Sequence, residues 1–124
     1  MKVSQESANA SILMLGGAAL VMLLLIGLSD LASFFLARSK AQTAADAAAL
    51  AAVAELIPTI GEDPQAKAEE YASANGAELV RCACSMASDV VEVTVVVPVH
   101  LTLRTVDAVH ARAKAEIALL LDPP

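Results

Sequence analysis

The sequence predicts an α+β fold, in which one long N-terminal helix crosses a membrane and continues into a small domain with an antiparallel sheet. Three observations predict this fold. The segment Ser7–Ser29 contains no charged residue. An alanine-rich stretch without glycine or proline follows it, from residue 37 to residue 56. In the last third of the chain apolar and polar residues alternate, which is the period of a half-buried strand.

The uncharged segment is long enough to cross a bilayer. As a helix its 23 residues extend roughly 34 Å, and a hydrocarbon core is about 30 Å thick. Its centre is apolar on every side, which favours lipid or a helical bundle around it. The alternatives are a cleaved signal sequence, whose apolar region is shorter, and a buried helix of a soluble protein. We expect a retained anchor that crosses the membrane once.

The charges that flank this segment do not fix its orientation. Lys2 lies on one side and Arg38 and Lys40 lie on the other, so the positive-inside rule does not decide. We expect the short N-terminus to stay inside, with the C-terminal domain extracytoplasmic in a cell-membrane protein. The expected divisions are the anchor at 1–36, an alanine-rich helical extension at 37–57 and a small α+β domain at 58–124.

Small residues on the long helix are candidates for close contact with neighbouring helices. Small side chains let another backbone approach, and simple helix propensity is the alternative explanation for the alanines. The candidate packing residues are Gly16, Gly17, Ala41, Ala44, Ala45, Ala48 and Ala52.

Two carboxylates bound the apolar segment. Asp30 is expected to be interfacial, or else paired within a bundle, because a charge inside lipid needs a partner. Glu6 is expected to be interfacial, or to pair with the N-terminal amine of a neighbouring chain.

Pro58 and Gly61 are expected to end the long helix, and a second, short helix should follow. Asp63 suits the N-cap, Pro64 suits the first helical position, and Gly76 suits the residue after the C-cap. One face of this helix should hold Ala68, Tyr71 and Ala72.

Three strands are expected after the second helix. The first is Glu78 to Ser85, with Val80, Cys82 and Cys84 on one side. The second covers Val91 to Leu103, either as one strand or as two that divide near Pro98. The third begins near Val109 and runs to Leu119. Antiparallel pairing of the three against the long helix would cover one apolar sheet face.

Composition excludes several classes of function. The net charge is −6, and from Ala41 onward twelve Asp/Glu stand against five Lys/Arg. A nucleic-acid surface needs the opposite sign and stacking aromatics, whereas aromatic residues make up only 2% of this chain. Catalytic motifs such as G-x-S-x-G, H-E-x-x-H and the phosphate-binding G-x-x-x-x-G-K-[ST] do not occur, so we expect neither an enzyme nor a cofactor.

Two cysteines and two histidines are residue types that can hold zinc. The C-x-C of Cys82 and Cys84, followed far along by His100 and His110, fits no common finger, so no metal is expected. The cysteines are expected to be small buried residues or to form a disulfide with another chain. A bridge between the two would be strained if both lie in one strand. Glu69 and Glu70 are expected to form a solvated helix face.

The alanine-rich stretch also carries a family resemblance. Residues 38–52 read R-x-x-A-Q-x-A-A-D-A-A-A-L-A-A after an apolar helix, and this resembles the TadE/TadG-like proteins of tight-adherence (Flp-type) pilus loci, in their short actinobacterial form. Weaker similarity lies in 74–82, in the valine-rich strand and in the Ala-Arg-Ala-Lys-Ala sequence near the end.

The resemblance implies a pilin-like fold and a minor-pilin-like or pseudopilin-like subunit of such a pilus or a related secretion system. Its partners would be membrane lipid and other pilin-like or secretion-system subunits, in a homo- or hetero-oligomer with packed N-terminal helices. The chain departs from the family pattern in two places. No glycine precedes Glu6 for a prepilin peptidase. Relatives often have a cysteine before or within the second helix that pairs with the one at Cys82, whereas this chain has only Cys84 nearby. The alternative function is a membrane-tethered module that binds an extracellular ligand.

Overall fold

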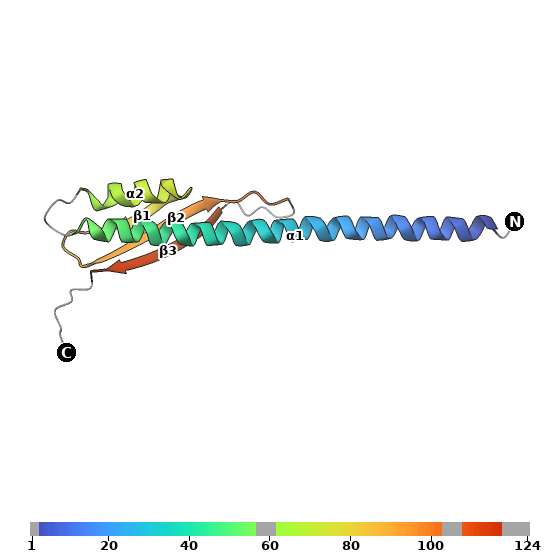
Figure 1. Cartoon of the computed structure of the whole chain (residues 1–124), viewed down its shortest axis with the longest axis horizontal. Helices are drawn as coiled ribbons and strands as arrows, with labels where there is room; N and C mark the ends of the chain where they lie inside the picture. The colour runs from blue at the N-terminus through green and yellow to red at the C-terminus, as the bar shows by residue number, and fades with distance from the viewer. Residues whose placement is uncertain (1–2, 57–61, 103–107, 118–124) are drawn as a thin grey trace, which may run out of the picture.

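The computed structural model describes residues 3–56, 62–102 and 108–117, and side chains from residue 9 onward. Helix α1 (Val3–Ala54) is a single rod, and its C-terminal part lies along a small domain formed by the rest of the chain. The domain contains helix α2 (Pro64–Ala74) and strands β1 (Glu78–Ala83), β2 (Val90–Pro98) and β3 (Ala108–Glu116). Figure 1 shows the N-terminal half of α1 projecting alone from this domain. The predicted α+β class, with one long helix and an antiparallel sheet, is confirmed.

The length of α1 follows from its sequence. No proline interrupts its 52 residues, and its second half is rich in alanine, the best helix former. Ser29 and Ser33 donate their hydroxyl protons to the carbonyl oxygens of Leu25 and Ser29, each over 2.9 Å, so these polar groups are satisfied within the helix. The helix ends at Ala54, before Pro58, as predicted; residues 57–61 themselves lie outside the described part.

Helix α2 has the predicted caps. The Asp63 carboxylate accepts a hydrogen bond from the Gln65 N–H over 3.1 Å, and Pro64 occupies the first turn. At the other end Gly76 N–H donates to the Ser73 carbonyl and Ala77 N–H to the Ala72 carbonyl, which is the Schellman arrangement. Ala68 and Ala72 are buried, whereas Tyr71, which was expected on the same face, is 45% exposed.

Gly76 has a φ of +69°, which L-residues with a side chain rarely adopt. We expect Gly76→Ala to lower the free energy of unfolding by about 1 kcal/mol. The new Cβ would also lie 2.5 Å from Nζ of Lys40, although that flexible side chain can move aside. Gly76→Asn should lose less, because asparagine tolerates this conformation better. Urea denaturation of the detergent-solubilised protein checks the order; equal losses for alanine and asparagine would contradict it.

The sheet has the order β1-β2-β3, with both pairs antiparallel. In the central strand β2 every second residue is buried, and the alternate residues face outward. The buried set on this strand is Val91, Val93, Val95 and Val97. Strand β2 ends at Pro98, where β3 begins opposite at Ala108, so the predicted break near Pro98 is confirmed, and residues 99–102 do not form a strand. Proline has no N–H to donate, which explains the end of the ladder there. The predicted third strand is confirmed through Glu116; Leu119 lies outside the described residues.

One prediction about β1 is wrong. Val80 was expected on the same side as Cys82, but the register shifts between Leu79 and Arg81, so one extra residue is accommodated there. A bulge of this kind reverses the alternation beyond it. As a result Leu79 and Cys82 pack against the core, and Val80 is 55% exposed.

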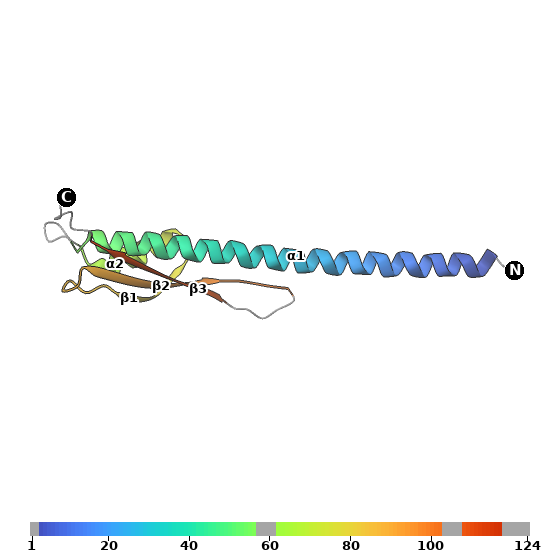
Figure 2. The same ribbon diagram turned by 90° about the horizontal axis from the view of Figure 1, so that it is seen from below.

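The two helices cover one face of the sheet. Figures 1 and 2 show α1 and α2 running side by side in opposite directions on the same side of the strands, with α1 in contact with β2 and β3 and α2 with β1. The other sheet face carries exposed or half-buried polar side chains such as Glu92, Thr94 and Arg112. The domain therefore has two layers, and its core lies between helices and sheet.

Candidate membrane anchor and helix-packing site

The projecting half of α1 is an apolar surface that no other described part of the chain covers. Its large apolar side chains between Ile12 and Leu36, except Phe34, are 36–80% exposed. Within Asn9–Ala54 the most apolar stretch reaches a mean hydropathy of 2.5 with none of its residues buried. By length and composition this helix can cross a membrane, so single-pass anchoring is compatible with the structure. Removing apolar surface from water gains roughly 25 cal/mol of free energy for each Å². This surface would forgo that gain if it stayed in water.

Gly16 and Gly17 lie within this apolar half. A Cβ built at either position would meet no atom within 4 Å, so no described part of the chain occupies the space beside them. The glycines therefore remain available to another helix, and their role in packing stays a prediction.

The five candidate alanines have a different environment. Ala41, Ala44, Ala45, Ala48 and Ala52 are all 0% exposed and belong to the core of the domain. They pack closely against the sheet and α2 of their own chain. The expectation that the alanine-rich extension docks against helices of other chains is corrected on this face of α1. Small side chains are needed here because α1 lies close to α2 and to two strands at once.

Asp30 lies at the end of the uncharged segment and contacts a distant part of the chain. Its Oδ1 accepts a hydrogen bond from the backbone N–H of Thr102 over 2.9 Å. The segment after β2 thus reaches back to the helix near its exit from the apolar half. The sequence carries no signal for this contact, because the two residues are 72 positions apart and the donor is a backbone group. The interfacial position of Asp30 stays a prediction, and the side chain of Glu6 lies outside the described ones.

Cys82 lies in β1 and Cys84 directly follows it, so the strand ends before the predicted Ser85; both side chains are half-buried against the core. The structure pairs Cys82 with Cys84 in a disulfide within the chain, with Cα atoms 5.3 Å apart. This differs from both alternatives that the sequence left open, which were small buried thiols and a disulfide with another chain. Ser85 and Ser88 form the turn that follows, with the Ser88 N–H donating to the Ser85 carbonyl over 3.0 Å.

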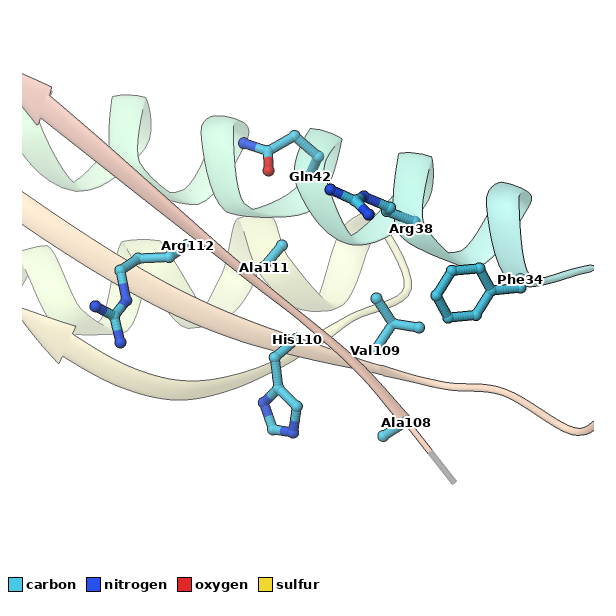
Figure 3. Close-up of a pocket in the computed structure, with 8 residues that line it drawn as sticks. All are labelled: Phe34, Arg38, Gln42, Ala108, Val109, His110, Ala111 and Arg112. Carbon is cyan, nitrogen blue, oxygen red and sulfur yellow. The ribbon is translucent and has the colours of Figure 1, made fainter. Parts of the chain in front are cut away.

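A shallow groove of about 440 Å³ lies between α1 and the edge strand β3. Figure 3 shows Phe34, Arg38 and Gln42 reaching from α1, with Val109 directed toward the Phe34 ring and His110 directed away from the helix. A second hollow lies further along the same two elements, beside Asp46 and Lys114. The groove mixes apolar and cationic groups but brings together no nucleophile and base.

The other ionisable side chains that were candidates for a site do not cluster in the described part of the chain. Among the described residues no group of three or more His, Cys, Asp and Glu side chains could hold a metal ion. Glu69 is exposed, and Glu70 accepts a hydrogen bond from Lys67 over 3.0 Å. Hydrogen bonds to Glu62 and then to Glu70 raise the pKa of Lys67 above its ordinary value. These ion pairs lie at the surface, where such pairs contribute little to stability.

The long helix is similar to a known protein family. Residues 8–55 match the family model described as "Putative Flp pilus-assembly TadE/G-like". The match covers α1 almost completely and less than half of the chain, and it confirms the resemblance that the sequence carries in 38–52. No curated protein and no solved structure matches the chain.

Proposed function

Because α1 matches the model of a TadE/G-like Flp pilus-assembly family, we propose that this protein is a non-enzymatic structural or assembly subunit, minor-pilin-like or pseudopilin-like, of a tight-adherence pilus or related secretion system. The family match supports involvement in pilus assembly. One observation carries the finer proposal: a single helix has one half bare and apolar and the other half built into a folded domain. Such a subunit needs only lipid and neighbouring subunits, without a reaction centre.

In this proposal the subunit acts through helix packing in the membrane. Association of helices in lipid depends on close van der Waals contact, since lipid tails are as apolar as leucine. Gly16 and Gly17 leave open space beside the bare half of α1, so a neighbouring helix can approach closely there. The domain stands on the extracytoplasmic side, and the assembly is a homo- or hetero-oligomer.

The main test uses membranes of the native host. We expect the tagged chain to co-purify with other pilus or secretion subunits from mild detergent, and its deletion to remove surface filaments. A strictly monomeric protein that brings down no such component, in cells whose filaments are unchanged, would contradict the proposal.

A sharper test addresses the glycines. In vesicles that hold donor- and acceptor-labelled copies, or the labelled chain with its co-purified partner, we expect Gly16→Leu with Gly17→Leu to weaken association at least tenfold, because the added side chains separate the helices. Ala18→Leu is the matched control, since it enlarges a small residue on another side of the same turn. Unchanged association of the double variant would show that the glycines make no contact.

The second candidate function is a tethered binding module, and the groove beside β3 is the observation that favours it. A binding module would use Arg38, Val109 and their neighbours to hold an extracellular ligand. Replacing Arg38 by Gln would then abolish that binding, whereas an assembly role through the membrane half of α1 predicts normal filaments in this variant.

A further inference from the structure

We propose that the domain rests on the lipid headgroups at its anchor end, with the segment from Val99 to Thr102 lying in the membrane interface beside α1. This inference rests on the proposed membrane anchoring and deepens it. It assigns a second, non-helical lipid contact to the chain. The occupant of the surface is the headgroup layer of the bilayer in which α1 is anchored.

The apolar surface of α1 extends past Asp30. Leu31, Phe35 and Leu36 are 52%, 59% and 71% exposed, and the next residue with a charge is Arg38. From Ile12 to Leu36 the exposed apolar part is about 36 Å long, which exceeds a hydrocarbon core of about 30 Å. The membrane boundary therefore falls near the last two turns of this surface, between Asp30 and Leu36.

The segment after β2 reaches the same level. The hydrogen bond from Thr102 N–H to Asp30 Oδ1 fixes Thr102 beside Asp30, six residues and about 9 Å closer to the N-terminus than Leu36. Figures 1 and 2 both show this segment leaving β2 and running along α1 toward the projecting half. If Leu36 contacts lipid, Thr102 lies at least as deep in the membrane as Leu36.

The composition of the contact suits the interface. Val99 is buried and Leu101 is half-buried against the core, while His100 and Thr102 are exposed, and no acidic residue occurs between Pro98 and Thr102. Asp30, the one carboxylate at this level of α1, has its Oδ1 hydrogen-bonded, which lowers the cost of its position.

The order of the charged residues along α1 also favours a contact with lipid. Arg38 and Lys40 are exposed and lie within about one turn beyond Leu36, and the acidic Asp46 and Glu55 follow only further out. A basic side chain near the surface is attracted to anionic lipid headgroups. Continuity with the anchor and this order of charges identify the lipid surface as the partner, in preference to a second copy of the chain.

The absence of tryptophan from the sequence allows a clean test with the full chain. Three single-tryptophan variants are reconstituted into phosphatidylcholine and phosphatidylglycerol vesicles: Thr102→Trp at the proposed contact, Leu24→Trp in the anchor and Met86→Trp on the exposed turn at the far end of the sheet. His100→Trp serves as a second reporter of the contact. Fluorescence quenching by brominated lipid is compared with quenching by aqueous acrylamide.

We expect brominated lipid to quench the Thr102→Trp and His100→Trp variants at least half as strongly as Leu24→Trp, and to leave Met86→Trp unaffected. Thr102→Trp and His100→Trp that behave like Met86→Trp, while Leu24→Trp is quenched by lipid, would overturn the inference and leave the anchor intact. Protection of both contact reporters from both quenchers would mean that protein covers the site, which also overturns it. If brominated lipid did not quench Leu24→Trp, the proposal that α1 is the membrane anchor would itself be contradicted.

Discussion

Two aspartates in the bare half of α1 should release the protein from the membrane. Leu20 and Leu24 are one turn apart and exposed, so Leu20→Asp with Leu24→Asp places two charges where lipid is expected. Each acidic residue at the centre of a membrane helix costs about 3 kcal/mol, hence about 6 kcal/mol for the pair. We expect the double variant to move from the membrane pellet to the soluble fraction after alkaline carbonate extraction.

The same helix provides a control for this experiment. Leu50 and Ala54 have the same spacing and are also exposed, but they lie in the domain. Leu50→Asp with Ala54→Asp should leave the protein in the pellet. If both double variants stayed in the membrane fraction, or both left it, the apolar half of α1 could not be the anchor.

A charge on the buried face of α1 should unfold the domain. Ala48 is 0% exposed in the core, so the carboxylate of Ala48→Glu would have neither room nor a partner. An uncompensated buried charge costs about 3–5 kcal/mol, a large fraction of the stability of a small domain. We expect urea denaturation of the solubilised protein, followed by circular dichroism, to show loss of the sheet transition.

Leu50→Glu, two residues further along and 64% exposed, is the matched control and should change the unfolding free energy by less than about 0.5 kcal/mol. Together, the two variants distinguish packing of the alanines within the domain from packing between chains. If Ala48→Glu folded normally but failed to associate with partner subunits, the alanine face would serve contacts between chains after all.

The elements that depend on local chemistry could be predicted from the sequence. The uncharged segment and the alanine run specify α1, the Asp63-Pro64 and Asn75-Gly76 pairs specify the ends of α2, and the alternating valines specify β2. In each case a few neighbouring residues determine the backbone conformation, so a window of sequence contains the information.

Features that depend on distant residues could not be predicted. The bulge near Val80 is set by pairing with β2, and the contact of Asp30 with Thr102 joins residues 72 apart. A small residue indicates that another element approaches closely, but it does not identify that element. The sequence therefore could not tell whether the alanines contact their own domain or another subunit. Only the fold shows that the chain's own sheet and α2 take that place.

The two-layer domain limits how subunits can crowd together. Helices in contact lie 8–10 Å apart, whereas the sheet and α2 add at least another layer of about that thickness on one side of α1. Two rods can meet at equal height through the sides that face away from their sheets. A tight cluster of anchors at one height therefore keeps the sheet and α2 of every copy on its outer side.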